Sequence, residues 1–195
     1  GYEYKLCKYC DEYKGYKNDY NAYQTVALSK TSYTYDGKEK KPGVTVTDWL
    51  GDPISKSEYT VTYPKSAKNV GKYTVTIKFK NHYTGTEKRT FTINPKGTSL
   101  SKVTSPKKAQ LKVTWKKQAT QTTGYQVQYS TSSKFKKAKT VTVSKNKSTS
   151  KSVGKLSAKK KYYVRVRTYK TVKIGGKSVK LYSGWSKAKS VTTKK

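Results

Sequence analysis

Apolar and polar residues alternate along much of the chain, which is the pattern of β-strands with one buried face. The clearest example is residues 162–169, where Tyr162, Val164 and Val166 share one face and Tyr163, Arg165 and Arg167 share the other. No stretch has a convincing helical period. The pattern therefore predicts an all-β protein.

Residues 25–95 hold a first series of predicted strands, at residues 26–28, 33–37, 44–48, 59–63, 70–79 and 89–93. Turn residues separate them, and Pro95 ends the last one. Residues 96–195 hold a second series, at residues 109–115, 124–129, 140–143, 148–153, 162–169 and 185–192. The Gly175-Gly176 pair predicts a hairpin turn. Strands this short and closely spaced predict two tandem β-sandwiches, residues 25–95 and 96–195, after a remnant of an upstream module at residues 1–24.

Several short motifs of the first series resemble bacterial Ig-like modules of Gram-positive surface proteins. They are Tyr-Thr-Tyr-Asp-Gly at 33–37, Tyr-Thr-Val-Thr-Tyr at 59–63, Asn-Val-Gly-Lys-Tyr-Thr-Val-Thr-Ile at 69–77, Tyr-Thr-Gly at 83–85 and Phe-Thr-Ile at 91–93. The likeness covers about 70 residues. It implies an Ig-like sandwich.

The second series resembles a fibronectin type III domain over about 100 residues. Trp115 matches the inward tryptophan of the second strand in that family, and Leu156 lies six residues before Tyr162, which matches the corner tyrosine. The alternating run from Val164 to Arg167 follows that tyrosine, as the family pattern requires. The resemblance implies that Tyr162 bonds back to nearby backbone and fixes the crossing between the sheets.

Arginine is scarce: the chain has three arginines, Arg89, Arg165 and Arg167, against 41 lysines. A planar guanidinium stacks between aromatic rings better than an ammonium does. Arg165 and Arg167 are therefore expected to interleave with Tyr182 and Trp185 on the neighbouring strand. Residues 182–186, Tyr-Ser-Gly-Trp-Ser, also resemble the Trp-Ser-x-Trp-Ser box of cytokine-receptor type III domains. That resemblance implies the same ladder and does not imply cytokine binding.

The net charge is +34, and it is unevenly distributed. Residues 88–195 contain 30 basic residues and no Asp or Glu. Lysine can solvate outward faces and block strand edges, but glutamate would solvate equally well. The pattern therefore indicates selection for positive charge and a polyanionic partner, such as an anionic cell-wall polymer. The candidate contacts are Lys107, Lys108, Lys112, Lys116, Lys117, Lys159, Lys160 and Lys161. Lysine in place of arginine argues against sequence-specific reading of nucleic acid.

Catalytic and metal-binding groups are few. The second series has no carboxylate and no histidine, so it lacks an obvious general acid or base. His82 is interpreted as a surface turn residue. A calcium site of Asp36, Asp48, Asp52 and Glu58 is conceivable, but turn formation explains the first three. Cys7 and Cys10 supply at most half of a zinc site, which needs four ligands. No cofactor is expected.

The resemblances imply a non-enzymatic module of a secreted or cell-surface bacterial protein. The specific hypothesis is adhesion through a lysine-rich domain that binds anionic wall polymer. Two alternatives stay open: a passive rigid spacer, or a carbohydrate-binding accessory region of an extracellular glycoside hydrolase. The partner could also be a polysaccharide or a host protein. The chain is expected to be a monomer. It is also expected not to insert into a membrane, because no apolar run is long enough for a membrane span or a signal peptide. The absence of methionine suggests a piece of a larger protein.

Overall fold

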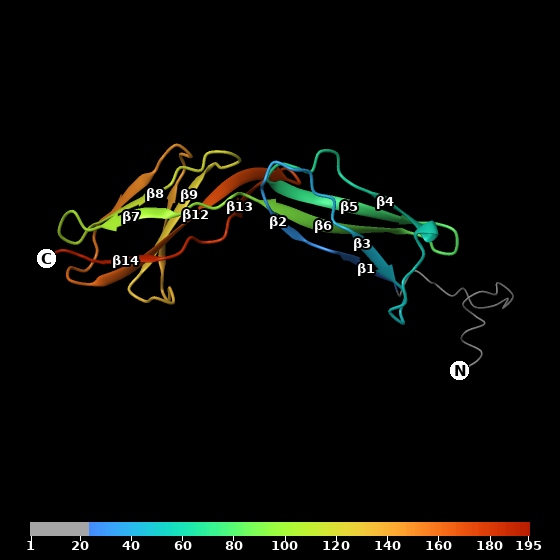
Figure 1. Cartoon of the computed structure of the whole chain (residues 1–195), viewed down its shortest axis with the longest axis horizontal. Helices are drawn as coiled ribbons and strands as arrows, with labels where there is room; N and C mark the ends of the chain where they lie inside the picture. The colour runs from blue at the N-terminus through green and yellow to red at the C-terminus, as the bar shows by residue number, and fades with distance from the viewer. Residues whose placement is uncertain (1–23) are drawn as a thin grey trace.

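The computed structural model describes residues 24–195 and is built almost entirely from β-strands (Figure 1). The strands are β1 (Thr25–Leu28), β2 (Ser32–Thr34), β3 (Val44–Thr47), β4 (Tyr59–Thr62), β5 (Gly71–Phe79), β6 (Thr86–Asn94), β7 (Leu100–Thr104), β8 (Leu111–Trp115), β9 (Gly124–Ser130), β10 (Lys139–Val143), β11 (Ser150–Val153), β12 (Lys161–Ile174), β13 (Lys177–Tyr182) and β14 (Lys189–Thr192). One short 3-10 helix, η2 (Lys56–Glu58), is the only helical element among these residues. The predicted all-β fold is confirmed.

Strands β1 to β6 form the first sandwich. Strands β1 and β3 make one antiparallel sheet, and the other sheet has the order β2-β6-β5-β4, in which β2 runs parallel to β6. Alternate residues of both sheets point inward. Val26 and Val46 come from the first sheet, and Ile77, Phe91 and Ile93 come from the second. These side chains form one hydrophobic core between the layers.

Strands β7 to β14 form the second sandwich. One sheet has the order β11-β8-β7 and the other the order β10-β9-β12-β13, with β14 also paired to β12. Strand β12 has 14 residues and pairs with β9 along one edge and with two strands in succession along the other. Its first residues pair with β14, and its last residues pair with β13. The core between the sheets includes Leu111, Val113, Trp115, Tyr125, Val127, Val164 and Val166.

Strand β7 has no counterpart in the sequence prediction, and β13 is implied only by the hairpin turn predicted at Gly175-Gly176, which joins it to β12. Strand β7 has only its first residue buried, and β13 is exposed over its first four residues, so neither alternates between apolar and polar. The predicted strand at residues 185–192 begins only at Lys189. The prediction that Trp185 lies on a strand is therefore wrong: it lies in the irregular connection between β13 and β14.

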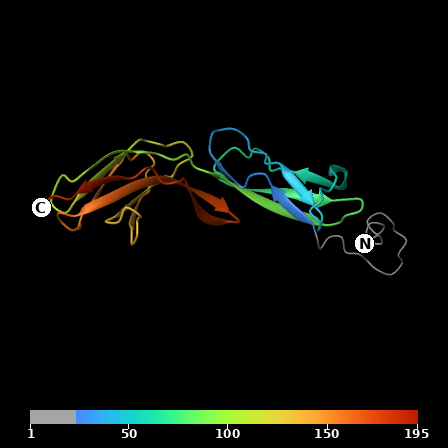
Figure 2. The same ribbon diagram turned by 60° about the horizontal axis from the view of Figure 1, so that its bottom comes forward.

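The two sandwiches lie end to end, and the C-terminus is at the end remote from the first sandwich (Figures 1 and 2). Hydrogen bonds cross the junction. The Gln121 side chain accepts from the Val70 amide at 3.3 Å and donates to the Asn69 side chain at 3.3 Å. The Lys96 carbonyl, in the segment between the sandwiches, accepts from the Thr168 hydroxyl at 2.8 Å. The first two bonds join the segment before β5 to the loop between β8 and β9, and the third ties the connection to β12.

Candidate functional site

Five side chains stack into a ladder on the outer face of β12. The Arg167 guanidinium lies 3.8 Å from the ring centroid of Tyr182 and 4.3 Å from that of Trp185. The Arg165 guanidinium lies 4.7 Å from Trp185 and 4.0 Å from Phe135. The structure thus brings together the four residues expected from the scarcity of arginine. It adds Phe135, from the loop between β9 and β10.

Strand β9 holds both arginines in place through two glutamines. The Arg165 Nε donates to Gln128 at 2.7 Å. Arg167 donates to Gln126 from two nitrogens, at 2.9 and 2.7 Å. Burial lowers the pKa of both guanidinium groups, but a guanidinium remains charged in proteins. The amide oxygens and aromatic faces therefore accommodate two partly buried cations where no carboxylate is at hand.

Two serines explain why the irregular connection follows β12 closely. The Ser183 hydroxyl accepts from the Thr168 amide, and the Ser186 hydroxyl accepts from the Val166 amide, both at 3.1 Å. The amides of Ser183 and Ser186 donate back to the carbonyls of Thr168 and Val166, at 3.1 and 2.8 Å. These four bonds replace strand pairing over this segment. They position Trp185 between the two arginines.

The remaining predicted structural residues lie around the core of the second sandwich. The Ser157 amide donates to the Tyr162 hydroxyl at 3.1 Å, which is the bond back to nearby backbone that the resemblance implied. Leu156 packs against the same core. Trp115 is 2% exposed, and its indole nitrogen donates to the Ser148 carbonyl at 3.0 Å.

Replacing Arg165 and Arg167 together by lysine is expected to lower the free energy of unfolding by about 1 kcal/mol, although the net charge is unchanged. An ammonium cannot stack between two rings and bond a glutamine amide in the same plane. Thermal unfolding followed by circular dichroism checks this, with Arg89→Lys in the first sandwich as the matched control. An unchanged thermal midpoint would count against a stabilising role for the ladder.

The eight predicted polyanion contacts are all exposed, but the fold separates them. Lys107, Lys108, Lys159, Lys160 and Lys161 come from loops and a strand start at the C-terminal end of the second sandwich. Lys112 lies on β8. Lys116 and Lys117 lie beside the connection between the two sandwiches. A shallow depression of about 310 Å³ there is lined by Gly97, Thr98, Ser99, Lys116, Lys117 and Gln118.

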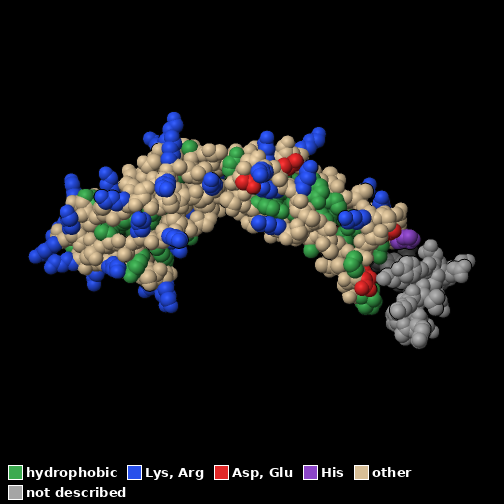
Figure 3. Space-filling view, in the orientation of Figure 1, with side chains coloured by type: hydrophobic (Ala, Val, Ile, Leu, Met, Phe, Trp, Pro, Cys, Tyr) green, Lys and Arg blue, Asp and Glu red, His purple; other side chains and the backbone are tan. Residues whose placement is uncertain are grey.

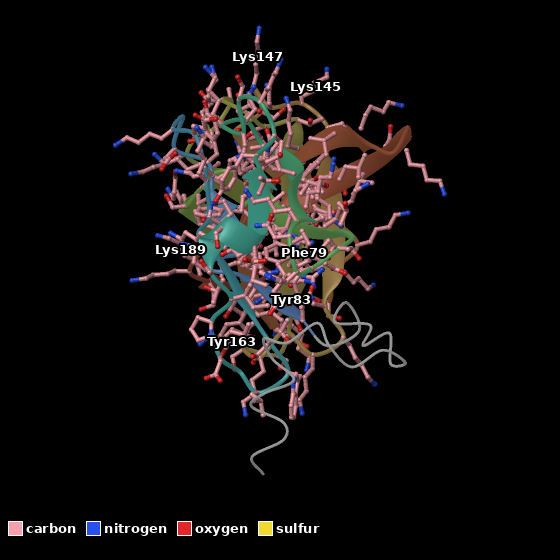
Figure 4. The ribbon with its side chains drawn as sticks, turned by 90° about the vertical axis from the view of Figure 1, so that its right-hand side faces the viewer. Phe79, Tyr83, Lys145, Lys147, Tyr163 and Lys189 are labelled. Carbon is pink, nitrogen blue, oxygen red and sulfur yellow. The ribbon has the colours of Figure 1, made fainter. Side chains whose placement is uncertain are left out.

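Blue side chains are scattered over and around the visible face of the second sandwich with no red one among them, whereas the first sandwich carries both signs (Figure 3). Lys145 and Lys147 are exposed, and their side chains project away from the loop between β10 and β11 (Figure 4). Ion pairs of the described residues involve carboxylates of the first sandwich, for example Lys40 with Asp36 at 2.6 Å. Residues 88–195 have no acidic side chain with which to form one.

The carboxylates considered for calcium have other roles. The Asp48 side chain accepts from the amides of Leu50 and Asp52, both at 2.9 Å, which shapes a turn. Glu58 lies 3.2 Å from His82, and the hydrogen bonds from His82 lower the pKa of this carboxyl although burial acts to raise it. Among residues 24–195, no three His, Cys, Asp or Glu side chains gather as a metal site. Cys7 and Cys10 lie outside the described residues.

Comparison with known families finds a match over most of the second sandwich. The family model of the Fibronectin type III domain matches residues 94–183. Domains of this type are usually extracellular and typically non-catalytic. No curated protein matches the chain. The part of the chain that the structure describes contains no helix of the length and apolarity that crossing a bilayer requires.

The solved structures that match this chain have low sequence identity to it. A structure titled as a myokine is 15% identical over 51% of this chain and 100% of its own length, with a TM-score of 0.38. The fn3 domain of human collagen alpha-1(XX) chain is 23% identical over 51% of this chain and 83% of its own, with a TM-score of 0.35. The FN1–FN3 domains of chicken CNTN1 are 18% identical over 89% of this chain and 56% of theirs, with a TM-score of 0.43.

Proposed function

We propose that this chain, with its fibronectin type III domain at residues 94–183, is a non-enzymatic attachment module of an extracellular bacterial surface protein. In this proposal, the second sandwich binds anionic cell-wall polymer by electrostatic attraction. The first sandwich is an Ig-like module of the kind found in Gram-positive surface proteins. The chain acts as a monomer.

The observation that carries the proposal is the charge of residues 88–195, which hold 30 basic residues and no Asp or Glu. Solvation alone does not require a single sign, because mixed charges keep a surface soluble and avoid self-repulsion. The repulsion among these lysines opposes folding at low salt. A partner that supplies many negative charges would relieve it.

The side chains of the second sandwich also argue against enzyme chemistry. Proton transfer and nucleophilic catalysis rely mainly on His, Asp, Glu and Cys, together with perturbed lysines. Residues 88–195 contain none of the first four. The arginine ladder is a polar cluster, but its arginines are engaged by glutamine side chains and aromatic rings, and its role in this proposal is to stabilise the sandwich.

Co-sedimentation of the whole chain with isolated Gram-positive cell walls over a range of salt tests the proposal. Binding is expected at low salt and should disappear near 1 M salt, where the Debye length falls to about 3 Å. Binding that ignores salt would contradict the electrostatic mechanism. Salt-independent retardation on polysaccharide gels would favour a sugar-binding role. Absence of binding to the walls even at low salt would favour the alternative in which the chain is a passive rigid spacer.

A further inference from the structure

Eight lysines gather at the end of the second sandwich that is remote from the first sandwich. We call them the distal cap: Lys107, Lys108, Lys155, Lys159, Lys160, Lys161, Lys194 and Lys195. They come from three segments, residues 105–110, 154–161 and 193–195. In these segments eight of 17 residues are lysine and none is acidic. The segments are far apart in the sequence, so the fold alone brings them together.

Hydrogen bonds donated by backbone amides join the three segments into one surface. The Lys194 amide donates to the Ser105 hydroxyl at 2.9 Å, and Lys108 forms a parallel bridge with Lys194. The Lys159 amide donates to the Thr193 carbonyl at 3.1 Å. The cap is therefore a fixed arrangement of backbone, from which the exposed lysine side chains extend.

Two cap lysines occupy a conformation that disfavours them. Lys155 has φ of 57° and Lys159 has φ of 52°, in the left-handed region where a side chain crowds its own backbone. The same protein uses Gly175 and Gly176, with φ of 56° and 77°, for the hairpin between β12 and β13. Glycine or asparagine would fit the two cap turns at lower conformational cost. Other described non-glycine residues share this conformation, among them Ala109 and Lys137, so it does not mark the cap, but it makes asparagine the substitution that preserves the two turns.

The cap also lies at the end of the second sandwich that is farther from the first sandwich (Figures 1 and 2). Figure 3 shows blue side chains around the end of the second sandwich that lies away from the first. All eight cap lysines are exposed. A flat or linear partner could approach this end without meeting the first sandwich, which lies at the opposite end (Figures 1 and 2).

We propose that the distal cap is the surface that contacts a linear phosphate polymer, so that the molecule docks end-on and holds its first sandwich away from the polymer. The inference rests on the proposed function and specifies the site and the ligand class. Lysine suits phosphate as a mobile point charge. Each exposed contact is weak, but a chain of phosphates can meet several cap lysines at once, and these contacts reinforce one another.

The test compares two variants of the whole chain that lose the same charge. The cap variant carries Lys155→Asn and Lys159→Asn, which suit the left-handed turns, and Gln at the other six cap positions. The control variant carries Gln at eight exposed lysines elsewhere in the second sandwich: Lys102, Lys112, Lys116, Lys117, Lys145, Lys147, Lys151 and Lys173. Both are titrated with long-chain inorganic polyphosphate at about 0.05 M salt, with thermal unfolding as the check on folding.

The cap variant is expected to bind polyphosphate at least about tenfold more weakly than the control variant, with a shallower dependence of log Kd on log salt. Equal losses in the two variants would overturn the cap while leaving the proposed function standing. Failure of the unaltered chain to bind at low salt would remove the proposed function itself. Single phosphate ions should not bind measurably, because they engage too few lysines.

A measurement on the unaltered chain keeps the inference testable if the cap variant does not fold. Lysine acetylation, mapped by mass spectrometry with and without polyphosphate, reports which amines the polymer covers. The cap lysines should be protected at least about threefold more than the control lysines, because the cap makes the multivalent contact. Uniform protection over both sets would overturn the end-on mode.

Discussion

Replacing Trp115 with alanine is expected to lower the free energy of unfolding of the second sandwich by about 3–5 kcal/mol. The indole is 2% exposed, and its ring centroid lies 5.2 Å from that of Tyr125. Its removal leaves a cavity between the sheets and strips the Ser148 carbonyl of its indole donor. Urea unfolding measures the loss, with the fluorescence of Trp185 reporting on the second sandwich.

Trp49→Ala is the matched control for this prediction. Trp49 is 65% exposed in the turn between β3 and β4 of the first sandwich. An exposed side chain away from such contacts changes stability by less than about 0.5 kcal/mol when truncated. If both tryptophan variants unfold at the urea concentration of the unaltered chain, Trp115 is not the packing centre described above.

Gly124→Ala is expected to destabilise the second sandwich by about 1–3 kcal/mol, through overpacking. A Cβ atom at residue 124 would lie 2.1 Å from the Val143 carbonyl oxygen and 3.0 Å from the Tyr169 ring. The first neighbour is backbone and cannot rotate away, so the pairing of β9 with β10 must shift. Thermal unfolding followed by circular dichroism, with the same baseline for each variant, gives the size of the effect.

Gly154→Ala provides the comparison for Gly124→Ala. A Cβ at residue 154 would meet nothing within 4 Å, and the backbone there is not in the left-handed region. This change should be neutral, or it should stabilise by about 0.4–1 kcal/mol because alanine restricts the unfolded chain. Equal destabilisation by the two alanines would contradict steric overlap at residue 124 as the cause.

Most strands could be predicted from the sequence wherever one face of the strand is buried and the other is exposed to solvent. Strand β12 is the clearest case, since Val164 and Val166 are fully buried while Arg165 and Arg167 lie on the other face. Strand β13 could not be predicted this way. Its position depends on pairing with the end of β12, and its own residues are mostly exposed and polar. Alternation is absent where the partner strand, not burial, determines the structure.

The candidate site was only partly predictable, for a related reason. The ladder could be inferred because arginine is rare, and rarity at Arg165 and Arg167 drew attention to their strand. Phe135 gave no such signal, because it lies alone among lysines in a loop with no periodicity. The distal cap combines residues more than 80 positions apart, such as Lys108 and Lys194. Lys194 and Lys195 were therefore not among the predicted contacts, and neither was Lys155, which stands apart from the lysine run at 159–161.

The central claim is that the second sandwich attaches the protein to an anionic polymer of the cell wall. The most direct measurement is sedimentation of the whole chain at low salt with Gram-positive walls, half of which have been stripped of teichoic acid. The account predicts that the protein pellets with intact walls and stays in solution with stripped walls, because only the intact walls carry the phosphate charges. Equal pelleting with both kinds of wall would contradict it.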